Sequence, residues 1–139
     1  MQITVVNHPL VQHKLSLLRE ADVLSVHVPL TAETRGLLGA AQFALMKPTA
    51  VVINTSRAEV FDEAALEDAL RTRRIAGAGL DVFHQEPVAA TSGLLALDNV
   101  VLSQHSAGHS YEAWFRRSQF TWENIRRVVA GETPLSLAR

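Results

Sequence analysis

Cysteine is absent from this sequence of 139 residues, and its absence excludes several kinds of chemistry. A chain without thiols forms no disulfide, uses no thiolate nucleophile and ligates no metal through sulfur. Long hydrophobic runs are also missing, because the apolar runs are far shorter than the roughly 20 residues that span a bilayer. The net charge of −1 gives no electrostatic reason to expect nucleic acid or an anionic membrane as a partner. The sequence therefore predicts a globular protein that binds neither.

Two further signals are missing. Met1 is followed by Gln-Ile-Thr, without the charged start and apolar core of a signal peptide, so we expect a cytoplasmic protein. The six histidines have no spacing with carboxylates that is typical of zinc sites, and we predict no metal.

The sequence does contain a regular alternation of short apolar runs with amphipathic segments. Asp62 is expected to cap one helix at its start, and Gly131 to cap another at its end. Strands that alternate with helices predict an α/β fold with a mostly parallel sheet. The predicted strands are 2–6, 23–28, 50–54, 77–82 and 99–103, and the predicted helices are 10–20, 31–38, 40–46, 63–73 and 109–130.

Three ionisable residues stand at or just after the ends of predicted strands. They are Arg57, Glu86 and His105. The carboxyl ends of parallel strands meet at one edge of a sheet, where α/β proteins place their chemistry, so we predict these residues as the functional core. Taken alone, each also has a plainer interpretation: a surface arginine, a solvated glutamate in a loop, and a histidine bonded to backbone.

Six motifs carry a resemblance to a known family. In this order, they resemble the second half of the nucleotide-binding domain of the D-isomer-specific 2-hydroxyacid dehydrogenases, over about 85% of the chain. The resemblance implies a partial Rossmann-like, doubly wound, mostly parallel sheet whose first βαβ unit, with its glycine fingerprint, is missing. The motifs are Ala21–Thr31, Leu45–Pro48, Asn54–Arg57, Asp62–Leu66, Gly79–Phe83 with Glu86-Pro87, and His105–Gly108.

The family transfers a hydride between NAD or NADP and a 2-oxo or 2-hydroxy acid. The resemblance implies that His105 is the acid/base, that Glu86 orients it and raises its pKa, and that Arg57 grips the substrate carboxylate. The sequence departs from the family at Ala58, where glycine is usual, and at His109, where a small residue is usual. The resemblance also implies a set of residues that contact the cofactor: Asp81, Val28, Pro29, Thr55, Ser56 and Gly108.

The N-terminal string Val6–Arg19 resembles a different family, uracil phosphoribosyltransferase, through its HPLVxHKLxxLR pattern. We favour this interpretation over a second strand of the dehydrogenase fold with Asn7 in place of its ribose-binding acid. The transferase's acidic phosphoribosyl-pyrophosphate loop is missing, so we expect no transferase activity. The expected organisation is a segment of separate origin at 1–20, a partial NAD-binding domain at 21–131 and a loose tail at 132–139.

The glycine-rich turn G-x-G-x-x-G, which holds a pyrophosphate in nucleotide-binding folds, occurs nowhere in the sequence. No stretch resembles the family's separate substrate-binding domain. We therefore expect an oxidoreductase in a truncated or partner-dependent form, acting on a small 2-oxo or 2-hydroxy acid. The alternatives are a non-enzymatic module that self-associates through an exposed sheet edge, and a product that folds poorly. A homo-oligomer or a complementing chain is expected as partner.

Overall fold

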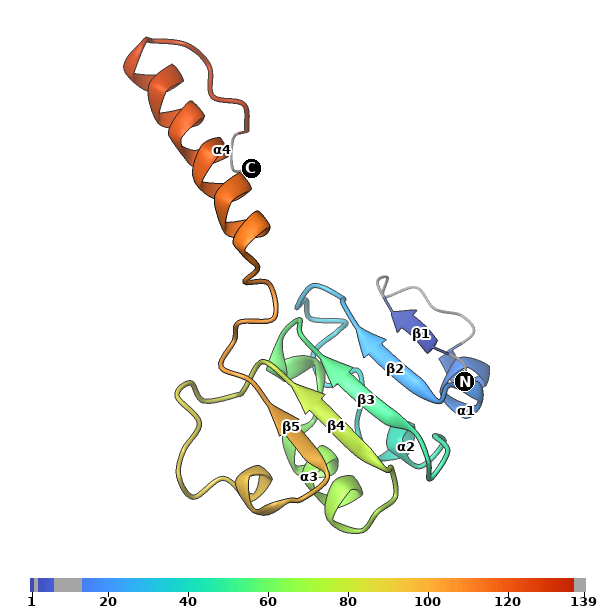
Figure 1. The fold of residues 1–139 in the computed structure, drawn as a ribbon. Coiled ribbons are helices and arrows are strands. Elements are labelled where there is room, and N and C mark those ends of the chain that lie inside the picture. The colour runs from blue at the N-terminus through green and yellow to red at the C-terminus, as the bar shows by residue number, and fades with distance from the viewer. Residues whose placement is uncertain (2, 7–13, 137–139) are drawn as a thin grey trace. The chain divides into compact units, whose positions relative to one another are not determined.

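A computed structural model describes residues 1, 3–6 and 14–136 of the chain. Its strands form one sheet in the order β1-β2-β3-β4-β5, and each neighbouring pair is parallel (Figure 1). The predicted α/β class and the parallel sheet are confirmed. The strands are β1 (Ile3–Val6), β2 (Val23–Val26), β3 (Val51–Asn54), β4 (Gly77–Leu80) and β5 (Val100–Leu102).

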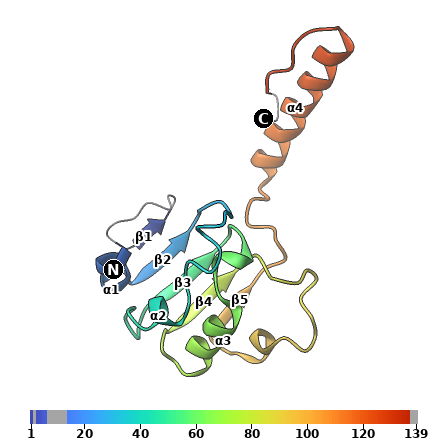
Figure 2. The same cartoon turned by 180° about the vertical axis from the view of Figure 1, so that it is seen from behind.

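The helices α1, α2 and α3 lie on one face of this sheet, as the two opposite views show (Figures 1 and 2). The strand order advances in one direction, so crossovers of the same hand place their helices on the same side. The described sheet is thus one wing of a doubly wound arrangement. The helices are α1 (Lys14–Glu20), α2 (Ala40–Phe43), α3 (Glu63–Arg71) and α4 (Tyr111–Val129), with 3₁₀ turns η1 (Ala58–Val60) and η2 (Gly93–Ala96).

The hydrophobic core lies between the sheet and these helices. Side chains of β2 and β3 alternate between buried and half-buried positions, as expected of strands with one covered face. Leu24 and Val52 are completely buried on the helix side, and Phe43 and Phe61 meet edge to face at 6.0 Å between ring centroids. This packing fixes the sheet whose edge carries the candidate site.

The opposite face of the sheet carries mostly apolar side chains, with Ser25 beside Ile53, and it is more exposed. Ile3 on β1 is 59% exposed and Val101 on β5 is 75% exposed. The parallel register places Val23, Val51 and Ile53 on the same face. We call these five apolar residues the open sheet face.

The chain divides into two compact units, residues 1–105 and residues 106–139. In the second unit, Ser110 caps the start of α4, because its hydroxyl accepts a hydrogen bond from the Ala113 amide at 3.1 Å. Gly131 follows the helix with a φ of 74°, which is the left-handed conformation expected of a C-terminal cap. The Leu135 amide then donates to Asn124 Oδ1 at 2.6 Å, so the residues after α4 fold back along it. Among the described residues, no helix combines the length and apolarity needed to cross a membrane.

The predicted helix at 31–38 is wrong. The Thr34 hydroxyl instead donates to the Pro29 carbonyl at 2.6 Å and holds the segment in a turn. Gly36, with a φ of 63°, ends the turn, and Leu38 forms a parallel bridge with Phe61. A helix over these residues would lose both the Thr34–Pro29 hydrogen bond and the bridge between Leu38 and Phe61.

The remaining predicted elements exist with shorter bounds. The predicted helix at 40–46 is reduced to α2, and that at 63–73 to α3. Asp62 caps α3 as predicted, because its Oδ1 accepts a hydrogen bond from the Ala65 amide at 2.9 Å. For the predicted helix at 10–20, the structure has α1 from Lys14, and residues 10–13 lie outside the described part of the chain.

Candidate functional site

The candidate site lies at the carboxyl edge of the sheet. The parallel register aligns Val26, Asn54, Leu80 and Leu102, so the segments that follow these residues leave the same edge (Figure 1). Each predicted ionisable residue of the functional core follows one of these strands. The structure therefore places the three residues after strands that end at one edge of the sheet, as the sequence predicts.

His105 and Glu86 form a direct pair. His105 Nδ1 lies 2.9 Å from Glu86 Oε2, and the other carboxylate oxygen accepts a hydrogen bond from the Phe83 amide at 3.0 Å. The bond to His105, followed by the bond from Phe83, lowers the pKa of Glu86 below its ordinary value of 4.5. The two side chains are 48% and 40% exposed, so a ligand can reach them from solvent. This pair was predicted, and the structure brings it together.

The backbone of His105 has an uncommon conformation. Its φ is 55°, in the left-handed region, where residues other than glycine are infrequent. Such conformations carry strain and are found at functional sites more often than elsewhere. No local sequence pattern predicts this backbone conformation at His105.

Arg57 lies on a tight turn after β3. Its backbone is extended, with φ −141° and ψ 137°, and it precedes the 3₁₀ turn η1. The exposed guanidinium donates from Nη1 to the Ser56 carbonyl at 2.7 Å. Because arginine has five N–H donors, this bond uses a small part of its capacity.

An open recess of about 500 Å³ adjoins Arg57. Its walls come from the segments after β2 and β3, and they combine apolar groups with the arginine. Three residues predicted to contact a cofactor, Val28, Pro29 and Ser56, are among them. The lining consists of His27, Val28, Pro29, Leu30, Ser56 and Arg57.

Asp81 is held below the surface. It is 3% exposed, and its Oδ1 accepts a hydrogen bond from the Ser103 hydroxyl at 2.6 Å. Its amide donates to the Asn54 carbonyl at 3.0 Å. Of the other predicted cofactor contacts, Thr55 is half-buried after β3, and Gly108 belongs to the second unit.

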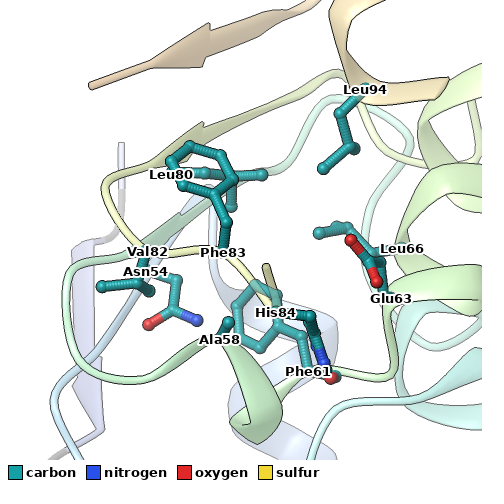
Figure 3. A pocket seen from close by; sticks show the side chains of 10 residues that line it. All are labelled: Asn54, Ala58, Phe61, Glu63, Leu66, Leu80, Val82, Phe83, His84 and Leu94. Atoms are coloured by element: carbon teal, nitrogen blue, oxygen red, sulfur yellow. Dashed lines mark hydrogen bonds between the residues drawn. The ribbon is translucent and has the colours of Figure 1, made fainter. Parts of the chain in front are cut away.

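A small cavity is lined by Asn54 and Ala58, which flank the turn after β3, together with residues of β4 and α3 (Figure 3). Its volume of about 20 Å³ leaves room for one water molecule and excludes an organic ligand. Ala58 is 7% exposed and lines this cavity, so its methyl group is accommodated where the family usually has glycine. His84 lines it too, with Nε2 lying 3.2 Å from the Phe61 carbonyl oxygen.

Sequence reasoning missed three residues that shape this edge. Asn54 binds the turn before Arg57, Ser103 binds Asp81, and His27 lines the recess. An asparagine at the end of an apolar strand is a known turn signal, because its side chain bonds nearby backbone. The partner of Ser103 lies 22 residues away in sequence, and no local pattern identifies it.

The residues present suit one end of a nicotinamide dinucleotide. The recess offers the apolar wall of Val28, Pro29 and Leu30 to a flat ring, with the polar Ser56 and Arg57 beside it. The glycine-rich turn for a pyrophosphate is missing from the sequence. The chain thus has an apolar recess of the kind that a flat ring requires, and its sequence contains no glycine-rich turn for the phosphates.

Comparison with protein families decides the relationship. Residues 6–107 match the model for the D-isomer specific 2-hydroxyacid dehydrogenase NAD binding domain. The chain belongs to the D-isomer specific 2-hydroxyacid dehydrogenase family. The resemblance predicted from the motifs after residue 21 is thereby confirmed, and the comparisons support NAD or NADP as the cofactor of this domain.

Individual members of the 2-hydroxyacid dehydrogenase family agree with this assignment. A glyoxylate reductase from Korarchaeum cryptofilum is 48% identical over 121 residues, which are 87% of this chain and 36% of that protein. The structure of D-lactate dehydrogenase with NAD+ from Lactobacillus jensenii matches with a TM-score of 0.84 and 30% identity, covering 99% of this chain and 47% of that one. A 2-hydroxyacid dehydrogenase from Xanthobacter autotrophicus Py2, in complex with NADPH and MES, matches with a TM-score of 0.78 and 35% identity, covering 99% and 60%. The chain spans about a third of the length of the curated relatives it matches.

The resemblance of the N-terminal string to uracil phosphoribosyltransferase finds no support in these comparisons. The match to the dehydrogenase family model begins at residue 6, so it takes in the whole of that string. Residues 7–13, which carry the HPLVxH part of the pattern, lie outside the described residues. The strand before them, β1, pairs in parallel with β2 as part of the dehydrogenase-like sheet.

Proposed function

We propose that this chain carries the catalytic edge of a nicotinamide-dependent oxidoreductase that interconverts a 2-oxo acid and a 2-hydroxy acid. The observation that carries the proposal is the 2.9 Å pair of His105 and Glu86 at the sheet edge that also bears Arg57. Membership of the dehydrogenase family supports the same reaction class.

Each of the three residues has a distinct role in this proposal. Glu86 accepts a hydrogen bond from Nδ1–H of His105, which fixes the ring and leaves Nε2 on its opposite side to hold the exchangeable proton. When bound, the nicotinamide supplies or accepts the hydride. During reduction, His105 gives its Nε2 proton to the substrate oxygen as negative charge builds there, and it takes the proton back during oxidation.

Arg57 binds the carboxylate that all 2-oxo and 2-hydroxy acids share. Its planar guanidinium can donate two parallel charge-assisted hydrogen bonds, which orient the neighbouring carbonyl. Orientation by such a clamp contributes to rate as well as to affinity, because the reacting atoms are held in register.

We propose further that the phosphate groups of the cofactor are held by residues outside these 139, in the same protein or in a second chain. The missing glycine-rich turn supports this, since backbone N–H groups at a helix start are the usual donors to pyrophosphate. A chain that supplies such a turn is expected to raise cofactor affinity.

A titration with NADH, followed by the cofactor's own fluorescence, tests the proposal first. Saturable binding and turnover of glyoxylate or hydroxypyruvate are expected, alone or with a complementing chain. His105→Ala should lower kcat by about 10²–10⁴-fold because it removes the proton donor. Arg57→Ala should mainly raise KM for the acid.

His84→Ala is the matched control, since His84 is another exposed histidine of the same unit, bonded to the Phe61 carbonyl. It should leave turnover near that of the unmodified chain. If the chain binds no NADH under any condition, including in the presence of a complementing chain, the proposed activity is contradicted.

A second candidate function is a self-associating module without catalysis. The exposed Ile3 and Val101 of the open sheet face favour it, because exposed apolar side chains are common at interfaces. A stable homodimer that binds no cofactor would distinguish this function from the first.

A further inference from the structure

Asn54 is the residue whose side chain holds the turn that presents Arg57. It ends β3 and is 1% exposed. Its Nδ2 donates to the Arg57 carbonyl at 2.9 Å, while its Oδ1 accepts from the Ser56 amide at 3.0 Å and the Ser56 hydroxyl at 2.9 Å. A single buried amide therefore binds the turn through both its donor and its acceptor.

The backbone of Asn54 ties this turn to the next strand. Its carbonyl accepts a hydrogen bond from the Asp81 amide at 3.0 Å, where the chain leaves β4. The Arg57 carbonyl, held by Asn54, also accepts from the Val60 amide at 3.2 Å. The turn is thus fixed between the sheet on one side and η1 on the other.

We propose that Asn54 is a positioning residue for the carboxylate-binding arginine. It acts through the backbone of residues 55–57, with no contact to the ligand. This inference rests on the proposed function for the role of Arg57, and on the hydrogen bonds alone for the role of Asn54.

The chemistry of the turn requires an amide. One end of the side chain must accept two hydrogen bonds and the other must donate one, and asparagine does both at this length. An ionised aspartate has the same shape but accepts only, so its second oxygen would repel the Arg57 carbonyl. Alanine removes both ends, so the Ser56 amide and hydroxyl lose this acceptor and the Arg57 carbonyl keeps its bond from the Val60 amide.

Asn99 offers a matched control. Its Nδ2 donates to two backbone carbonyls, those of Leu70 and Ala76, at 3.2 Å each. It stands just before β5, at the amino edge of the sheet and away from the candidate site. Asn99→Asp therefore makes the same chemical change to a backbone-bound amide without touching the turn.

The first measurement is the binding of oxalate, an unreactive dicarboxylate, by calorimetric titration. Arg57→Ala gives the baseline without the arginine. We expect Asn54→Asp to weaken oxalate binding by about tenfold or more, because the guanidinium is no longer held in place. Asn99→Asp should bind oxalate as the unmodified chain does. Equal binding by Asn54→Asp and the unmodified chain, or an equal loss in Asn99→Asp, would overturn the inference.

The second measurement reports on the turn without a ligand. In Asn54→Ala, the backbone amide signals of residues 55–58 should shift or broaden, and the Ser56 amide should exchange faster with solvent. Unchanged signals there would overturn the role of Asn54 whatever the oxalate result. If the unmodified chain fails to bind oxalate while these signals do change, the proposed function of Arg57 fails and the role of Asn54 in the turn stands.

Discussion

At the scale of single residues, the site is a set of polar groups whose partners hold them in place. Glu86 is held by the ring of His105 and the amide of Phe83, and Asp81 by the hydroxyl of Ser103. Glu86 and its partner His105 are exposed at the surface, whereas Asp81 is buried. The difference suits a pair that exchanges protons with a ligand and a carboxylate that shapes the edge beneath it.

The pair of Glu86 and His105 predicts a pH dependence. The pKa of Glu86 is lowered, so its interaction with His105 contributes in full above the ordinary value of 4.5 and is lost as the pH falls through the lowered pKa. We expect His105→Ala to raise the titration midpoint of the Glu86 carboxyl toward its ordinary value, because the largest cause of the shift is removed. The bond from Phe83 should keep it somewhat below that value. NMR of the Glu86 side-chain carbon between acid and neutral pH measures both midpoints.

A matched titration of Glu123, a glutamate of α4 whose pKa is lowered by its bond to Arg126, should be the same in both proteins. Equal Glu86 midpoints in the two proteins would contradict the pairing.

At the scale of elements, caps and turns set where the segments begin. Asp62 accepts a hydrogen bond from the Ala65 amide at the start of α3. This helix packs Leu66 and Leu70 into the core beside the site. Asp62→Ala should reduce the free energy of unfolding by about 0.5–2 kcal/mol, because an N-terminal amide of the helix loses its acceptor. Urea unfolding measures the loss.

Asp62→Asn is the control, since asparagine caps helices as well as aspartate does. It should retain most of the stability. A loss as large as that of Asp62→Ala would mean that the cap is not the source of the effect.

Most elements could be predicted because their signals are local. An alternation of apolar residues marks a strand, and an aspartate before a helical pattern marks a helix start, as at Asp62. The predicted helix at 31–38 was wrong because Leu38 forms a parallel β-bridge with Phe61, which lies 23 positions further along the chain. Tertiary pairing there outweighs local propensity.

The candidate site was predictable to the same extent. Strand ends and motifs identified Arg57, Glu86 and His105, and the structure brings the last two into contact. The roles of Asn54 and Ser103 depend on which buried groups face them, and this is fixed only by the packed sheet. The left-handed backbone of His105 has the same origin.

At the scale of the whole molecule, the chain combines a sheet with one covered face and a separate helical unit. The helix α4 contains no buried residue, and large side chains such as Trp114 and Trp122 are 63% and 69% exposed. Apolar surface of this kind is common at protein interfaces.

The open sheet face gives the test of self-association. Val101 lies on the edge strand β5 and is 75% exposed, so Val101→Lys should weaken any dimer that uses this face, because a charge would be buried without a partner. Sedimentation of the unmodified chain over a range of concentrations is expected to reveal an oligomer that this substitution reduces to monomers. Leu95→Lys, which alters a half-exposed residue of η2 outside the sheet, is the control and should leave the oligomer intact. A chain that stays monomeric at every concentration would contradict the self-associating module. An oligomer unaffected by Val101→Lys would instead mean that association uses another surface, with the exposed face of α4 as the next to be substituted.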